Sequence, residues 1–137
     1  MFLLIFPKAD INVQFDKNYS FRESSLMAEI VRLLISHGAD LNALDITEST
    51  PLHMASFSWT PDVVRILIEN GASVNAQNET HSTPLHRASL LGNPEIVRLL
   101  IEHGADVTAL DWNHKTPLHL ASSWVSTGIC HSITVQS

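Results

Sequence analysis

The chain has 137 residues and a hydrophobic content of 45%, which suits one folded domain and argues against wholesale disorder. Its formal net charge of −6 argues against a nucleic-acid-binding protein, because such proteins need a basic surface to neutralise phosphates. The single cysteine, Cys130, cannot form an internal disulfide, and no apolar run approaches the roughly 20 residues of a membrane-spanning helix. We therefore expect an intracellular protein of the cytoplasm or nucleus, without a membrane association.

The first 44 residues contain fragments of a pattern that becomes complete further along the chain. The apolar start lacks a basic leader, so it does not predict a signal peptide. Instead, Leu3-Leu-Ile5 and Ala9-Asp-Ile-Asn12 recur thirty residues later as Leu33-Leu-Ile35 and Ala39-Asp-Leu-Asn42. We expect residues 1–12 to be the end of one unit. Residues 13–44 then form a degenerate unit with an intact helix over 29–37.

Residues 45–77 and 78–110 are two copies of the complete unit. More than half of their aligned positions carry the same residue. The tetrapeptide Thr-Pro-Leu-His recurs at a constant step of 33 residues, beginning at Thr50, Thr83 and Thr116. A Gly-Ala pair keeps the same step, at Gly38, Gly71 and Gly104. This regularity indicates internal duplication.

Each copy predicts two helices joined by a turn. A threonine hydroxyl can cap the free N–H groups of a helix start, and proline fits the first helical position, so a helix begins at Thr50-Pro51. A second helix begins at Thr60-Pro61, and its apolar face is wide enough to need burial between neighbouring units. Gly71 ends that helix, because glycine adopts left-handed geometry without penalty. The alternating residues after it predict an extended hairpin arm.

The last unit matches the repeat pattern only in its first half. Residues 111–122 repeat the signature, but the second helix should cover about 128–136. Only Ile129 and Ile133 fall on apolar positions there, and several neighbours are poor helix formers. Because repeat stacks need end caps and about three repeats for stability, we expect the chain to be marginally stable and to be a fragment, splice form or gene-model product of a longer protein.

The 33-residue period and the Thr-Pro-Leu-His signature resemble the ankyrin repeat, over roughly residues 9–123. The resemblance implies an all-α solenoid of helix-turn-helix units with connecting β-hairpin loops, about four repeats long and incomplete at both ends. The ankyrin-repeat domain is expected to span 1–123 and to be followed by a divergent tail at 124–137. Its repeats are expected at 1–12 (partial), 13–44 (degenerate), 45–77, 78–110 and 111–137 (partial).

Two departures from the family pattern carry structural expectations. The family usually has glycine at the hairpin tip, where this chain has Glu48, His81 and His114, so these residues are expected to be strained or the turns to differ. Trp59 also stands where the next repeat has Gly92. That replacement predicts either a shifted loop or a buried indole.

The eight histidines do not predict a metal site. His81 and His86, like His114 and His119, are five residues apart, which does not place both on one helical face. The resemblance instead implies hydrogen bonding within the signature turn for His53, His86 and His119. Arg32, Arg65 and Arg98 recur as a ridge that is expected to be solvated or salt-bridged, with phosphate or acidic-partner binding as the alternative.

No catalytic set is predicted. Cys130 and His131 are adjacent in sequence, but neither an orienting group nor an oxyanion site can be located for them. There is no glycine-rich phosphate loop and no hydrolase or metalloprotease motif. We therefore expect no enzyme activity, no catalytic residue, no metal and no cofactor.

The resemblance implies that a partner protein docks on the concave side, which consists of the hairpin tips and the exposed face of the first helices. Trp112 at a hairpin tip is the hardest side chain to bury, and exposed aromatic residues favour interface anchoring. The expected partner-binding residues are Ile46, Thr47, Phe57, Glu79, Thr80, Leu90, Leu91, Trp112, Asn113, Lys115 and Trp124.

The predicted function is that of a protein–protein interaction scaffold that uses a rigid surface. Two alternatives remain open. The chain could be a targeting or substrate-recognition segment of a larger enzyme or ubiquitin-ligase assembly, because ankyrin repeats are commonly joined to such modules. It could also be a nonfunctional fragment. The sequence does not identify the partner, because a recognition surface carries no reaction signature.

Overall fold

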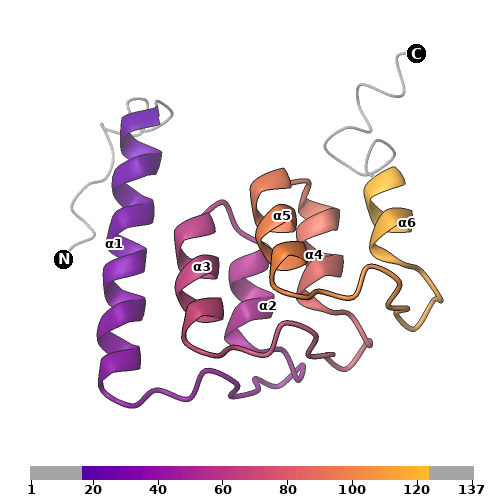
Figure 1. The fold of residues 1–137 in the computed structure, drawn as a ribbon, viewed down its shortest axis with the longest axis horizontal. Helices are drawn as coiled ribbons and strands as arrows, with labels where there is room; N and C mark the ends of the chain where they lie inside the picture. The colour runs from indigo at the N-terminus through magenta and orange to yellow at the C-terminus, as the bar shows by residue number, and fades with distance from the viewer. Residues whose placement is uncertain (1–16, 124–137) are drawn as a thin grey trace.

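The computed structural model describes residues 17–123, with side chains from Ser25 onward, and this part of the chain is a row of helices in two layers (Figure 1). The helices are α1 (Lys17–Ser36), α2 (Pro51–Ser56), α3 (Pro61–Glu69), α4 (Pro84–Leu91), α5 (Pro94–Glu102) and α6 (Pro117–Ser122). Helices α2, α4 and α6 pack in sequence as an inner layer, and α1, α3 and α5 form the outer layer. None of the described helices is long and apolar enough to cross a membrane.

The signature starts each inner helix by a reciprocal cap. In α4, the Thr83 hydroxyl accepts the His86 N–H at 3.3 Å, and the His86 Nδ1 accepts the Thr83 N–H at 3.1 Å. The same capping box begins α2 at Thr50 and α6 at Thr116. These contacts satisfy N–H groups that have no partner inside the helix. The predicted helix starts and the predicted role of the signature histidines are confirmed.

The core lies between the two layers and is centred on the two complete repeats. Leu52, Val64, Ile96 and Leu100 are fully buried, and Leu85 is 2% exposed. The small residues Ala55 and Ala88 are also buried, which lets the inner helices approach closely. The wide apolar face of α3 is therefore covered from both sides, as the pattern predicts for a stacked repeat, whereas that of α5 is covered on the side of α3 and α4.

The loops between repeats are compact turns, and no β-strand forms within residues 17–123. The extended hairpin arms that were expected here therefore contain no paired β-strands among the described residues. Each tip closes through its own backbone, as when the Asp45 N–H donates to the Ser49 carbonyl at 3.1 Å. Neighbouring tips are joined by one backbone hydrogen bond, from the Glu79 N–H to the Thr47 carbonyl at 3.0 Å. One bond per pair of tips cannot build the ladder of a sheet.

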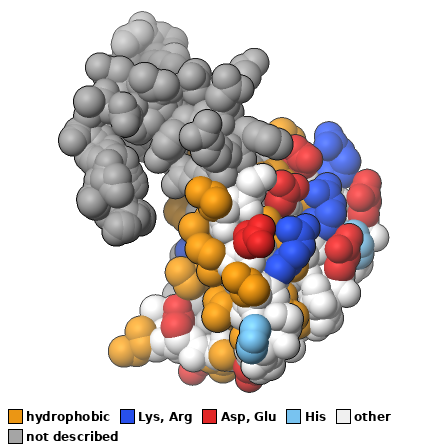
Figure 2. Space-filling view, turned by 90° about the vertical axis from the view of Figure 1, so that its left-hand side faces the viewer, with side chains coloured by type: hydrophobic (Ala, Val, Ile, Leu, Met, Phe, Trp, Pro, Cys, Tyr) orange, Lys and Arg blue, Asp and Glu red, His pale blue; other side chains and the backbone are white. Residues whose placement is uncertain are grey.

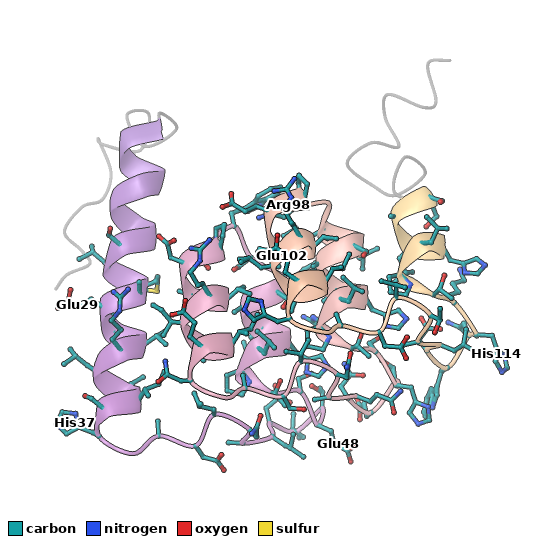
Figure 3. The ribbon with its side chains drawn as sticks, viewed as in Figure 1. Glu29, His37, Glu48, Arg98, Glu102 and His114 are labelled. Atoms are coloured by element: carbon teal, nitrogen blue, oxygen red, sulfur yellow. The ribbon has the colours of Figure 1, made fainter. Side chains whose placement is uncertain are left out.

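The residues that replace glycine at the tips adopt the left-handed conformation, as expected. Glu48, His81 and His114 have φ angles of 62°, 62° and 61°. Glu48 and His114 lie at the loop edge of the molecule, away from the helical layers (Figure 3). Non-glycine residues pay a steric cost in this region, so each tip stores local strain.

Two features distinguish the N-terminal part of the stack. The described part of the unit at 13–44, residues 17–44, contains the single long helix α1 and no inner helix, in keeping with the missing first-helix signature. Helix α2 ends at Ser56, whereas α4 continues to Leu91 and is stopped by Gly92 with a φ of 88°. Trp59 is 65% exposed, so the indole is not buried, and the loop that carries it begins two residues earlier than the equivalent loop after α4.

Candidate functional site: the inner-layer surface

The candidate site is the exposed side of α2, α4 and α6 together with the adjoining loop tips, called here the recognition surface. Ten of the eleven predicted partner-binding residues lie within the described chain, and Trp124 lies outside it. Leu91 is half-buried. The other nine are exposed, namely Ile46, Thr47, Phe57, Glu79, Thr80, Leu90, Trp112, Asn113 and Lys115.

Trp112 is the largest apolar side chain on this surface. It is 63% exposed, which agrees with the prediction that a tip position cannot bury it. Its ring packs edge-on against His81, with centroids 5.9 Å apart and an interplanar angle of 61°. The backbone N–H of Trp112 donates to the Thr80 carbonyl at 3.0 Å. The bond fixes the backbone that carries the indole and the contact with His81 restricts its ring, which lowers the entropy lost when a partner covers it.

A second feature is a shallow hollow of about 180 Å³ between the inner helices. Phe57, Arg87, Leu90 and Leu120 come to it from α4, α6 and the end of α2. The Arg87 guanidinium carbon lies 5.0 Å from the centre of the Phe57 ring, within the range of a cation–π contact. The structure thus places one positive charge among apolar side chains on the recognition surface.

Arg87 was not among the partner-binding residues predicted from the sequence, although the repeat alignment marks it. Arg87 occupies the position that holds Met54 and Leu120 in the flanking repeats, so a charged residue replaces an apolar one. Its Nε is buried and has no hydrogen-bond partner among the described residues. A buried polar atom without a partner is costly, and the guanidinium nevertheless remains half-buried against Phe57.

The tips are fixed by side-chain hydrogen bonds at each turn. The Asp45 carboxylate accepts N–H groups from Thr47 at 2.8 Å and from Ser49 at 3.0 Å. These bonds, led by the one from Ser49, hold the pKa of Asp45 below its usual value. The Asn78 side-chain oxygen accepts the equivalent N–H groups in the next repeat. The tip residues are thus presented on rigid turns.

The outer layer offers less for recognition. Arg65 pairs with Asp62 on its own helix at 3.2 Å, and both side chains are substantially exposed. This agrees with the expected salt-bridged ridge, and such a surface pair contributes little to stability. Within residues 17–123, no three His, Cys, Asp or Glu side chains converge in a way that could hold a metal ion.

Comparison with known proteins identifies the repeat. The family model described as ankyrin repeats (three copies) matches residues 2–78 and 75–134, which together cover most of the chain. Among curated proteins, none matches the sequence significantly. The family match extends over the incomplete first and last units as well as the two complete repeats.

Proposed function

Because this chain belongs to the ankyrin-repeat family, whose members generally mediate protein–protein interaction, we propose that it binds a segment of another protein along the recognition surface. The observation that supports this most directly is the exposure of Trp112 on a tip that is otherwise rigid. Aromatic anchors held in this way contribute much of the affinity at protein interfaces.

The second anchor point suggests the chemistry of the partner. The apolar side chains Phe57, Leu90 and Leu120 line the hollow beside Arg87, together with the polar residues Asn78, Thr80, Ser82 and His86, and the guanidinium already stacks on the Phe57 ring. A carboxylate could pair with Arg87 while an adjacent apolar side chain covers Leu90. We therefore propose a partner segment with an acidic residue next to an apolar one, binding without a cofactor.

The test begins with peptides selected from a display library against the purified chain. The dissociation constant of a selected peptide is then measured by calorimetry for the natural chain and for Trp112→Ala. We expect Trp112→Ala to weaken binding by more than about 1 kcal/mol. Trp59→Ala is the matched control, because Trp59 is equally exposed but lies in the loop between α2 and α3.

An equal loss for both tryptophan variants, or no loss for either, would contradict a binding site at the tips. Arg87→Gln tests the acidic component separately. It should weaken peptides that contain the acidic residue and leave their amide counterparts unchanged. Circular dichroism of each variant shows whether the helical fold is retained.

A further inference from the structure

The two ends of the described stack expose positions that the complete repeats bury. Leu52 and Leu85 are 0% and 2% exposed, whereas Leu118, which has the same place in α6, is 72% exposed. In the outer layer, Ile68 is 9% exposed and its counterpart Ile101 is 45% exposed. Both differences occur at the C-terminal end, where α6 has no outer helix beside it among the described residues.

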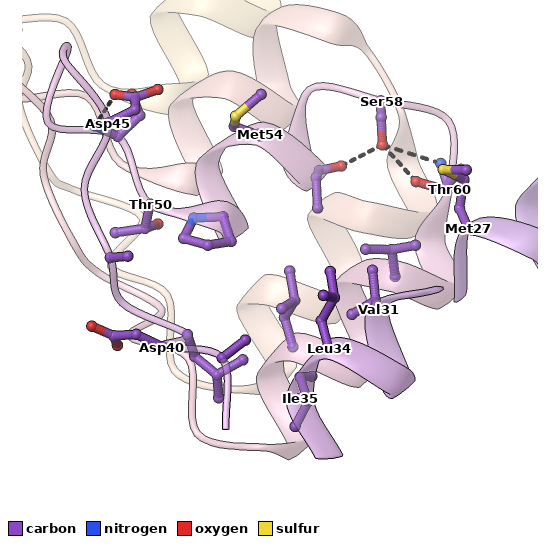
Figure 4. Close-up of a pocket in the computed structure, with 18 of the residues that line it drawn as sticks. Met27, Val31, Leu34, Ile35, Asp40, Asp45, Thr50, Met54, Ser58 and Thr60 are labelled. Atoms are coloured by element: carbon purple, nitrogen blue, oxygen red, sulfur yellow. Dashed lines mark hydrogen bonds between the residues drawn. The ribbon is translucent and has the colours of Figure 1, made fainter. Parts of the chain in front are cut away.

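The N-terminal end has the opposite deficiency. Helix α1 is an outer helix whose repeat has no inner helix between residues 17 and 123, and a groove of about 530 Å³ lies there. The groove is almost wholly apolar. In Figure 4, Val31, Leu34 and Ile35 border the open space on one side and Thr50 and Met54 border it on the other. The end of the stack beyond α1 also shows a band of hydrophobic side chains (Figure 2).

Hydrogen bonds between repeats show which groups a complete neighbour would supply. The His53 Nε2 donates to the Ser82 carbonyl, and the His86 Nε2 to the Lys115 carbonyl, both at 2.8 Å. The next member of this series, the His119 Nε2, has no partner within residues 17–123. The Ser49 carbonyl, which precedes the first signature, accepts the Asp45 N–H but no histidine of the described residues.

The loop tips show the same arrangement. The Glu79 N–H donates to the Thr47 carbonyl, and the Trp112 N–H donates to the Thr80 carbonyl. Continuing this series leaves a carbonyl at Asn113 and an N–H at Ile46, neither of which pairs within the described chain. Among the residues that the structure describes, one end therefore carries an Nε2 and a carbonyl without a partner. The other end carries the matching carbonyl and N–H.

We propose that the groove beside α1 binds α6 of a second copy of this chain. Helix α6 of one copy and α1 of the next would form one composite repeat, with an inner helix from the first chain and an outer helix from the second. Leu118 would be buried against Leu34 and Met54. The His119 Nε2 would donate to the Ser49 carbonyl of the other copy, and Ile101 of α5 would cover the outer side of α1.

The second copy fits the groove better than the chain's own termini. An occupant must present an inner helix with a signature histidine in register with Ser49, and α6 carries that signature. Residues 1–16 contain no histidine. The tail at 124–137 lies largely within the family match but has only Ile129 and Ile133 on apolar helical positions, so α1 of a second copy offers the more apolar face to α6. Because the two surfaces differ, the contact is head-to-tail and can extend beyond a dimer.

The test uses two full-length variants that each disable one end. Leu118→Glu places a charge on α6 and leaves the groove intact, whereas Met54→Glu places a charge in the groove and leaves α6 intact. Both side chains are largely exposed, so both variants should keep the helical spectrum of the natural chain. Sedimentation velocity is then recorded for each chain alone and for an equimolar mixture, at concentrations up to about 100 μM, where contacts of moderate affinity become populated.

We expect the natural chain to form dimers and larger species as concentration rises. Each variant alone should remain monomeric, and the mixture should form a one-to-one dimer that grows no further. Adding His119→Ala to Met54→Glu should weaken that dimer by about tenfold or more, because the change removes a hydrogen bond of about 1.4 kcal/mol between the chains and also the cap of α6. A natural chain that stays monomeric, or a mixture that stays monomeric, would overturn the proposal. So would self-association of both single variants, which would place the contact elsewhere.

Discussion

The complete repeats and the C-terminal unit share the Thr-Pro-Leu-His signature, yet the surroundings of that signature differ. Leu85 and Leu118 follow the same Thr-Pro pair, and each begins a helix capped by threonine and histidine. Leu85 is 2% exposed because α6 and α5 lie beside α4, whereas Leu118 is 72% exposed. The local structure of the motif is therefore independent of its position in the stack, but its burial depends on the neighbouring repeat.

This difference separates what a repeat provides by itself from what its neighbours provide. The capping box forms equally well at α2, α4 and α6, because all its atoms lie within four consecutive residues. The hydrogen bond from the histidine Nε2 and the burial of the leucine need the next repeat. In a solenoid, stability is approximately a sum of such intrinsic terms and interface terms. The comparison can be tested by substitutions that affect one term at a time.

The largest effect is expected for the leucine pair. Leu85→Ala should lower the free energy of unfolding by about 2–5 kcal/mol, because it leaves a cavity in a closed part of the core. Leu118→Ala makes the same chemical change at the end of the stack. It should change the free energy of unfolding by less than about 0.5 kcal/mol. Urea denaturation followed by circular dichroism measures both.

These measurements are made at low protein concentration, so that self-association does not bury Leu118. Similar losses for the two variants would mean that the C-terminal end is covered in solution. The distinction between interior and end units would then fail for this face of α6.

The next largest effect on stability is expected from backbone strain at the loop tips, which arises within each repeat. Glu48→Gly should raise the free energy of unfolding by about 1 kcal/mol, because glycine adopts a φ of 62° without steric cost. His114→Gly should give a similar gain, although it lies near the opposite end of the stack. His81→Gly should gain less, since it also removes the contact with Trp112.

Alanine variants provide the control for this strain. Glu48→Ala and His114→Ala keep a Cβ atom and should give no comparable gain in thermal or urea unfolding. If alanine stabilised as much as glycine, the effect would come from removing the charged or aromatic side chain. Left-handed backbone strain would then not be its cause.

The features that were predictable from the sequence are those that lie within one repeat. Thr83, Pro84 and His86 specify a capped helix start through contacts at most three residues apart, so the motif alone predicts it. The exposure of Trp112 was predictable because its tip position has no core beside it. Helix boundaries were less predictable, as the early end of α2 at Ser56 shows.

Features that depend on several repeats were not predictable in the same way. The stacking of Arg87 on Phe57 joins side chains from two inner helices, and its effect on the hollow depends on both. The groove beside α1 arises because residues 17–24 continue one long helix instead of forming a separate inner helix. The sequence showed that the first-helix signature is missing there. It did not show which side chains would border the groove.

The smallest effect is expected for the pH dependence of stability. It tests only the interface between the two complete repeats. Burial, together with nearby Arg87, lowers the pKa of His53 below its ordinary value of 6.5, although the bond to the Ser82 carbonyl and the charge of Asp45 act in the opposite direction. The neutral ring is also required for capping, since the His53 Nδ1 accepts the Thr50 N–H. The unfolded chain therefore binds more protons than the folded chain as pH falls below 6.5, and stability should decrease there.

Thermal melts at pH 7.5 and pH 5.5 measure this dependence. The natural chain should melt at a lower temperature at pH 5.5, and His53→Gln, which cannot titrate, should show a smaller difference between the two conditions. The variant should also be less stable at both pH values, because glutamine does not reproduce the bonds to Thr50 and Ser82. An unchanged pH difference in His53→Gln would assign the effect to other histidines. A buried histidine between two repeats would then contribute to stability through its hydrogen bonds alone, without making the interface sensitive to pH.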